Sequence, residues 1–166
     1  MEKNIIREYT DFQEMYNEAL DIVHFYSQTE IQGSLTEKIK YIRKTHDGDQ
    51  LNSFYNIGFI SELVAKSINS TSLLLKISMD SLVKNIIEHP EISEREYLKI
   101  QYYVENADYI LLKNEKNLIY FKIDNTLYQF VVKNTKDGKE NFITTYHKAN
   151  IKQLQKDIKR YINIKK

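Results

Sequence analysis

The feature that most constrains the fold is a change of hydrophobic pattern between residues 104 and 109. Before it, apolar residues recur every three or four positions, as they do on one side of an amphipathic helix. After it come four short runs rich in aromatic and β-branched residues, which favour β-strands. These runs are residues 109–112, 117–123, 126–133 and 141–147. A chain with helices first and strands later is expected to be an α+β protein.

Short links between these runs determine how the strands should pair. Asp124-Asn125 is a two-residue turn, and residues 134–138 form a longer turn that ends in glycine. Links this short join antiparallel neighbours. We therefore expect N-terminal helices, then a four-stranded antiparallel β-meander, then a C-terminal helix with Ile151, Leu154 and Ile158 on its apolar side.

Hydroxyl residues mark where the helices should begin, because Ser and Thr side chains accept hydrogen bonds from the first backbone N–H groups. They are Thr10, Ser34, Ser61, Ser78 and Ser93. Three of them have Gln or Glu three positions later, which is the capping-box pattern. A turn is expected at Gly58, and Pro90 should end the helix of Ser78 near His89.

A polar segment with a glycine, residues 45–49, is the clearest boundary signal in the chain. It divides a helical N-terminal extension, residues 1–48, from a second domain, residues 49–166. The charge is also unevenly distributed. Residues 1–50 hold six Lys or Arg against ten Asp or Glu, and residues 147–166 hold seven against Asp157 alone.

The basic C-terminal segment suits a polyanion such as RNA. Lys148, Lys152 and Lys156 are the residues expected to follow an RNA backbone. The alternative is that these lysines form the solvent-exposed side of a helix and bind nothing.

Several classes of function are made improbable by composition. The chain has no cysteine, so disulfides, thiolate metal sites and a cysteine nucleophile are excluded. With four glycines and no phosphate-binding motif, an ATP-dependent or dinucleotide enzyme is not expected, and neither is a cofactor. No signal peptide and no long apolar run is present, so we expect a cytoplasmic protein without a membrane partner.

The four histidines have no metal-binding spacing, so no metal site is expected. His24 is expected to pack at a helix surface, and His46 to lie in a solvated loop. His89 is at a helix end, where the helix dipole favours a histidine whatever its function. His147 is the last residue of the last expected strand, and it is a candidate second acid or base.

Polar side chains at the ends of the late strands are the other candidates. Lys133 closes an apolar strand, where it is either functional or merely extends its ammonium to water. Strict strand alternation places Thr144 and Tyr146 on one face, and Thr145 and His147 on the other. All four serve one site only if the strand contains a bulge.

The order of these features resembles a known family. The runs HPEISEREYLKIQYYVENADYILL and LIYFKIDNTLYQFVVKNTKDGKENFITTYHKAN resemble the phage-associated branch of the barnase–EndoU–colicin–RelE-like (BECR) nucleases, and IGFISELVAKSI resembles its lead-in helix. The likeness covers about residues 52–148. It implies the catalytic residues His89, Lys133 and Thr144, with Tyr146 beside them. Glu88 departs from the family, in which a basic residue often precedes the histidine, and a carboxylate there favours the imidazolium.

The resemblance implies a metal-independent ribonuclease of toxin type, encoded by a phage or mobile element and controlled by an inhibitor protein. RNA, possibly tRNA, would be cleaved by attack of its own 2′-hydroxyl, which leaves a 2′,3′-cyclic phosphate and spares DNA. The chemistry needs a base, an acid and positive charge near the phosphate. Two alternatives stay open: a catalytically inert, nuclease-like binding module, and a structural adaptor.

Overall fold

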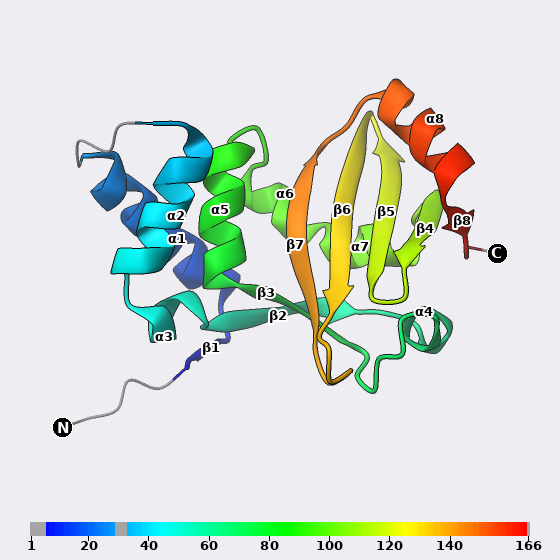
Figure 1. Ribbon diagram of the computed structural model, residues 1–166, viewed down its shortest axis with the longest axis horizontal. Helices are drawn as coiled ribbons and strands as arrows, with labels where there is room; N and C mark the ends of the chain where they lie inside the picture. The colour runs from blue at the N-terminus through cyan, green and yellow to red at the C-terminus, as the bar shows by residue number, and fades with distance from the viewer. Residues whose placement is uncertain (1–5, 29–32, 166) are drawn as a thin grey trace. The chain divides into compact units, whose positions relative to one another are not determined.

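A computed structural model describes residues 6–28 and 33–165 (Figure 1). Its strands form one eight-stranded mixed sheet in the order β1-β2-β3-β7-β6-β5-β4-β8. The general α+β class is compatible with this architecture. The prediction of a sheet with only four antiparallel strands is wrong, because the sheet has eight strands and is mixed.

The four strands of the expected meander are present in the order expected. They are β4 (Tyr109–Asn114), β5 (Asn117–Asp124), β6 (Thr126–Asn134) and β7 (Asn141–Lys148). Each pairs antiparallel with the next. The strands that the sequence did not reveal are β1 (Glu8–Tyr9), β2 (Phe54–Phe59), β3 (Leu74–Ser78) and β8 (Ile162–Asn163).

The additional strands make the sheet mixed. β1 pairs with β2 in parallel, and β3 pairs with β7 in parallel through Leu75 opposite Asn141. Parallel partners cannot be joined by a tight turn, so they come from distant parts of the chain. The sequence around residues 74–78 does not indicate which strand it pairs with, because the partner strand lies more than sixty residues later.

The chain forms two compact units, and neither is one continuous stretch. We call Met1–Asn56 with Ile77–Pro90 the helical unit, and Ile57–Lys76 with Glu91–Lys166 the sheet unit. The expected division into residues 1–48 and 49–166 stays a prediction.

In the helical unit, helices α1 (Phe12–Ser27) and α2 (Leu35–Thr45) pack against α5 (Met79–Glu88), and α3 (Gly48–Leu51) is a single short turn. The core of this unit combines aliphatic and aromatic side chains. Its buried residues include Tyr9, Phe12, Met15, Ala19, Ile22, Tyr26, Ile39, Ile42, Leu82 and Val83. Arg43 on α2 donates two hydrogen bonds of 2.9 Å to the carboxylate of Asp80 on α5.

Helix starts agree closely with the sequence. Ser34, Ser61 and Ser78 cap α2, α4 (Glu62–Ser67) and α5, and Ser93 forms the full capping box of α6 (Glu94–Leu98). At the first helix the cap is Asp11 and not Thr10, because the Asp11 carboxylate accepts a hydrogen bond from the Gln13 backbone N–H.

A turn was expected at Gly58, but this residue lies inside strand β2. A side chain here would collide with the carboxamide of Gln101 on α7 (Ile100–Glu105), which accepts a hydrogen bond of 2.6 Å from the Phe59 backbone N–H. This glycine therefore permits a close approach between strand and helix.

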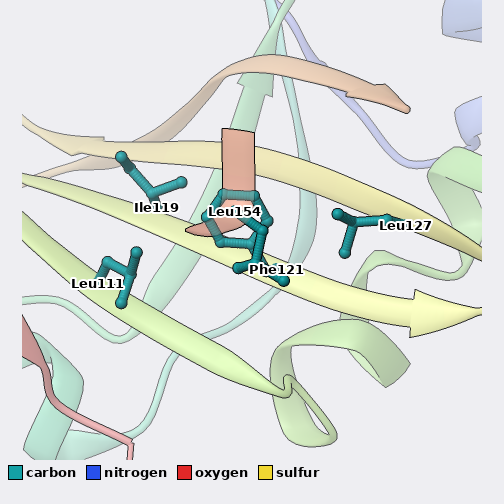
Figure 2. Close-up of a cluster of buried hydrophobic side chains, with 5 residues drawn as sticks. All are labelled: Leu111, Ile119, Phe121, Leu127 and Leu154. Atoms are coloured by element: carbon teal, nitrogen blue, oxygen red, sulfur yellow. The ribbon is translucent and has the colours of Figure 1, made fainter. Parts of the chain in front are cut away.

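The sheet formed by β4 to β7 in the sheet unit is covered on both faces. On one face, Leu154 of α8 (Ile151–Arg160) packs on Leu111, Ile119, Phe121 and Leu127, as Figure 2 shows. On the other face, Tyr97 of α6 and Tyr103 of α7 pack on Tyr146 and Tyr128, at ring-centroid distances of 5.4 and 5.2 Å. Within the described ranges, no helix is long and apolar enough to span a bilayer.

Candidate functional site

His89 lies where the sequence predicts, directly after the last residue of α5. Its backbone N–H donates to the Asn85 carbonyl oxygen at 2.7 Å and caps the helix end. The side chain is 26% exposed, and its Nε2 lies 3.9 Å from the Glu88 carboxylate. His89 belongs to the helical unit, whereas Lys133, Thr144 and Tyr146 belong to the sheet unit. The predicted catalytic set is thus divided between the two units.

His46 differs from the expected solvated loop residue. Its Nδ1 lies 3.1 Å from the Tyr26 hydroxyl, and its Nε2 lies 2.6 Å from Oε1 of Gln50. These two contacts connect the end of α2 to α1 and α3, which is a structural role.

Tyr146 is a core residue. Its side chain is fully buried, its ring packs edge-on against Tyr97 and Phe130, and its hydroxyl donates to the Glu96 backbone oxygen at 2.9 Å. Burial raises the pKa of its phenol far above the ordinary value. Tyr146 has no exposed surface for a substrate to contact. Its catalytic role stays a prediction.

A β-bulge at Thr144 changes the faces of strand β7. Val131 of β6 pairs with Thr145, but the next residue, Val132, pairs with Ile143, so Thr144 is the extra residue. Ile143 and Tyr146 are both buried, although strict alternation would place them on opposite faces. The bulge therefore separates Thr144 from Tyr146, contrary to the alternation expected from the sequence.

Because residues directly opposite each other share a sheet face, the register groups six side chains on one side of β6 and β7. We call this group the Lys133 face. It contains Gln129, Val131 and Lys133 of β6 with His147, Thr145 and Phe142 opposite them. Lys133 is exposed, and Thr145 and His147 are half-buried. The structure thus places Thr145 and His147 together with Lys133.

The imidazole of His147 has a defined proton position. Its Nδ1 lies 3.0 Å from the Lys148 backbone oxygen. A carbonyl oxygen only accepts, so Nδ1 carries the proton and Nε2 is the basic nitrogen of the neutral ring.

The spacing along the strands limits what the Lys133 face can hold. Gln129, opposite His147, and Lys133 are four residues apart on one strand, which is roughly 13 Å at 3.3 Å per residue. Thr145, opposite Val131, lies between them. This length exceeds a single phosphate group and suits a short run of nucleotides.

The three lysines predicted to bind RNA do not form one group. Lys152 and Lys156 are exposed and one turn apart on α8, opposite the side that carries the buried Leu154. Lys148 pairs with Tyr128 and therefore lies on the other sheet face, with its ammonium 6.0 Å from that ring.

Lys148 has a structural partner there. Burial alone would raise the pKa of Glu96, but hydrogen bonds with Tyr128 and Ser93 and the charge of Lys148 hold it below its usual range. Lys148 therefore belongs to the electrostatic surroundings of Glu96.

Gln129 is a candidate that the sequence interpretation missed. It is 8% exposed, and its Oε1 has no hydrogen-bond partner among the described residues. The available signal was an amide between two aromatic residues, Tyr128 and Phe130, in an otherwise apolar strand.

Among the residues that the structure describes, no group of three or more His, Cys, Asp or Glu side chains is placed to hold a metal ion. Comparisons with protein-family models, curated proteins and solved structures give no match.

Proposed function

We propose that the protein binds RNA on the Lys133 face and cleaves it without a metal ion. The observation that supports this most is the register of β6 and β7, which brings an exposed cation, a hydroxyl and an imidazole to one face. These are the groups that phosphodiester cleavage by an internal nucleophile requires.

In the proposed reaction, Nε2 of His147 takes the proton of the 2′-hydroxyl while that oxygen forms a bond to phosphorus. The bond to the 5′-oxygen breaks, and the leaving oxygen takes a proton from a water molecule. The hydroxide that remains is neutralised by the proton held on His147. Lys133 and the Thr145 hydroxyl contact non-bridging oxygens and stabilise the added negative charge. The products are a 2′,3′-cyclic phosphate and a free 5′-hydroxyl.

His89 remains a separate prediction. The resemblance to the BECR nucleases names it as the acid or base, and its position at a helix end is confirmed. Its contribution is tested by its own substitution, independently of His147.

The test is cleavage of a mixed RNA in the presence of EDTA. His147→Ala and Lys133→Ala are each expected to lower the rate by about a hundredfold, the range typical of one acid–base or charge-stabilising group. His89→Ala is measured beside them. Matched controls are His24→Ala on the exposed side of α1 and Lys139→Ala in the β6–β7 turn, which should keep the wild-type rate.

Undiminished cleavage by both His147→Ala and Lys133→Ala would contradict the assignment of the site. A loss in His89→Ala alone would return the catalytic role to the residue named by the resemblance.

A second function, RNA binding without cleavage, is favoured by the roughly 13 Å between the ends of the Lys133 face. Groups so far apart suit successive nucleotides better than one reacting phosphate. RNA that is bound in a salt-dependent way but stays intact in EDTA, with Lys133→Ala weakening the binding, would establish this function. A toxin role and an inhibitor partner follow only if RNA is cleaved.

A further inference from the structure

Phe142 is the phenylalanine of the Lys133 face, and its ring lies apart from the aromatic core of the sheet unit. It is half-buried, so part of the ring stays open to solvent. Phe130 on the neighbouring strand stacks on Tyr120 and packs against Tyr146. Within the described part of the chain, Phe142 makes no such contact with another aromatic ring. Its ring therefore has surface that the other aromatic residues do not use.

The strand register places Phe142 between two lysines. Lys133 of β6 and Lys76 of β3 pair directly with it from opposite sides, and paired residues project to the same face. The Nζ of Lys76 lies 3.1 Å from the Glu140 carboxylate, which balances its charge. Lys133 is exposed and forms no ion pair within the described ranges. The row therefore combines a partly open ring with a cation that no described carboxylate neutralises.

Helix α8 covers a different part of the same sheet face. The cluster beneath it includes Leu127 and has Val131 at its margin. Lys133 follows two residues later on the same strand, roughly 7 Å further at 3.3 Å per residue. Neither Lys133 nor Phe142 belongs to this cluster. The Phe142 ring is thus not needed to fill the space under the helix.

We propose that Phe142 stacks on an unpaired nucleobase, and that the substrate of the Lys133 face is therefore single-stranded RNA. The proposal rests on the proposed function, since it names the substrate class and a binding residue of the same face. Proteins that bind single strands combine cations along the backbone with aromatic rings on which bases stack. A base inside a duplex is already stacked between its neighbours and is not free to lie on this ring.

The position of Phe142 separates its role from that of His147. Phe142 lies opposite Lys133, whereas His147 lies opposite Gln129, roughly 13 Å along the strand at 3.3 Å per residue. With a base on Phe142, Lys133 contacts a phosphate of that nucleotide, and the reacting 2′-hydroxyl near His147 belongs to another nucleotide. Phe142 is therefore a binding residue and not a catalytic one.

The first experiment compares the binding of a fluorescent thymidine deoxyoligonucleotide as a single strand and as a duplex with its complement. It lacks the 2′-hydroxyl, so the proposed cleavage does not consume it. A surface that attracts only charge favours the duplex, which has the higher charge density. The wild-type protein is instead expected to bind the single strand about tenfold more tightly, on the scale of one base stacked on an aromatic ring.

Three variants separate stacking from attraction of charge. Phe142→Leu keeps an apolar side chain and removes the ring, so it should weaken the single strand about tenfold and leave the duplex unchanged. Phe142→Tyr keeps a ring of the same shape and should bind like the wild type. Lys133→Ala removes the cation and should weaken both forms.

A second measurement observes the stacking directly. The chain contains no tryptophan, so Phe142→Trp introduces a single indole at the proposed site. Its emission should be quenched when the single strand binds, because the base lies on the ring. Phe25→Trp, at an exposed position of α1, is the matched control and should keep its emission. This measurement does not depend on whether Phe142→Leu folds.

Duplex binding as tight as single-strand binding, an equal loss of both forms in Phe142→Leu, or equal quenching of the two tryptophans would overturn the proposal. So would a wild-type protein that binds neither form. Failure of the stacking site is distinguishable from failure of the ribonuclease. RNA cleavage in EDTA without quenching at position 142 removes the stacking site alone, and quenching at position 142 without cleavage removes the ribonuclease alone.

Discussion

At the residue scale, Tyr146 and Tyr120 are two buried tyrosines that differ in the hydrogen bonding of their hydroxyls. Both are fully buried in the sheet unit, with their rings in contact with Phe130. The Tyr146 hydroxyl donates to the Glu96 backbone oxygen, whereas the Tyr120 hydroxyl has no hydrogen-bond partner in the part of the chain that the structure describes. The sequence suggested a catalytic phenol at Tyr146, next to the threonines. In the structure, its hydroxyl makes a hydrogen bond inside the core.

We therefore predict opposite effects of the same substitution at these two positions. Tyr146→Phe should lower the free energy of unfolding by about 1 kcal/mol, because it removes the hydrogen bond that the Tyr146 hydroxyl donates to the Glu96 backbone oxygen. Tyr120→Phe should leave stability unchanged or raise it, because it removes an unpaired buried hydroxyl. Urea unfolding measures both. A Tyr146→Phe protein that unfolds like the wild type but no longer cleaves RNA would restore the catalytic interpretation of this residue.

At the element scale, helix starts depend on residues close in sequence, whereas the side chains on each face of β7 depend on a distant strand. The caps of α2, α4, α5 and α6 follow from a hydroxyl and its next few residues, all close in sequence. The bulge at Thr144 depends on strand β6 and on which side chains the core accepts. Thr145 and His147 could be grouped with each other from sequence, but not with Lys133.

The capping box of α6 gives the prediction at this scale. Ser93→Ala removes the side-chain acceptor for the Glu96 backbone N–H, and it should lower the free energy of unfolding by about 1 kcal/mol. Ser93→Thr keeps the cap and serves as the control. Equal losses in the two variants, measured by chemical denaturation, would mean that the hydroxyl does not stabilise the helix start.

At the scale of the whole molecule, the tyrosines link stability to alkaline pH. Burial raises the pKa of Tyr9 and of Tyr128 from the ordinary 10.0 to about 12, and it raises the pKa values of Tyr103, Tyr120 and Tyr146 as well. Below pH 10 the folded and unfolded chains both keep these protons. Above it the unfolded chain releases them first, so the folded state loses stability as the pH rises toward 12.

We predict that the protein is stable to about pH 10 and unfolds cooperatively above it. Phenolate absorbance and circular dichroism, followed together, should then change in one transition for the buried tyrosines. Full phenolate formation in a chain that keeps its native circular dichroism would contradict the burial described for these rings.

The sequence by itself determined the elements whose signals are local. Caps, a proline stop, short turns and a change of period were enough for the main helices, for the β4–β7 meander and for the position of His89 at a helix end. Hydrogen bonds and turns between near neighbours need no distant partner, so their residues carry the information.

The tertiary structure decided what depends on distant partners. It added β1, β2, β3 and β8 to the sheet, it buried Tyr146, and it placed Thr145 and His147 with Lys133 through a bulge. A strand exists only when another strand satisfies its backbone, and one extra residue moves every later side chain to the other face. That is why the sequence showed which residue types the candidate site contains, but not which of these residues lie together on one face.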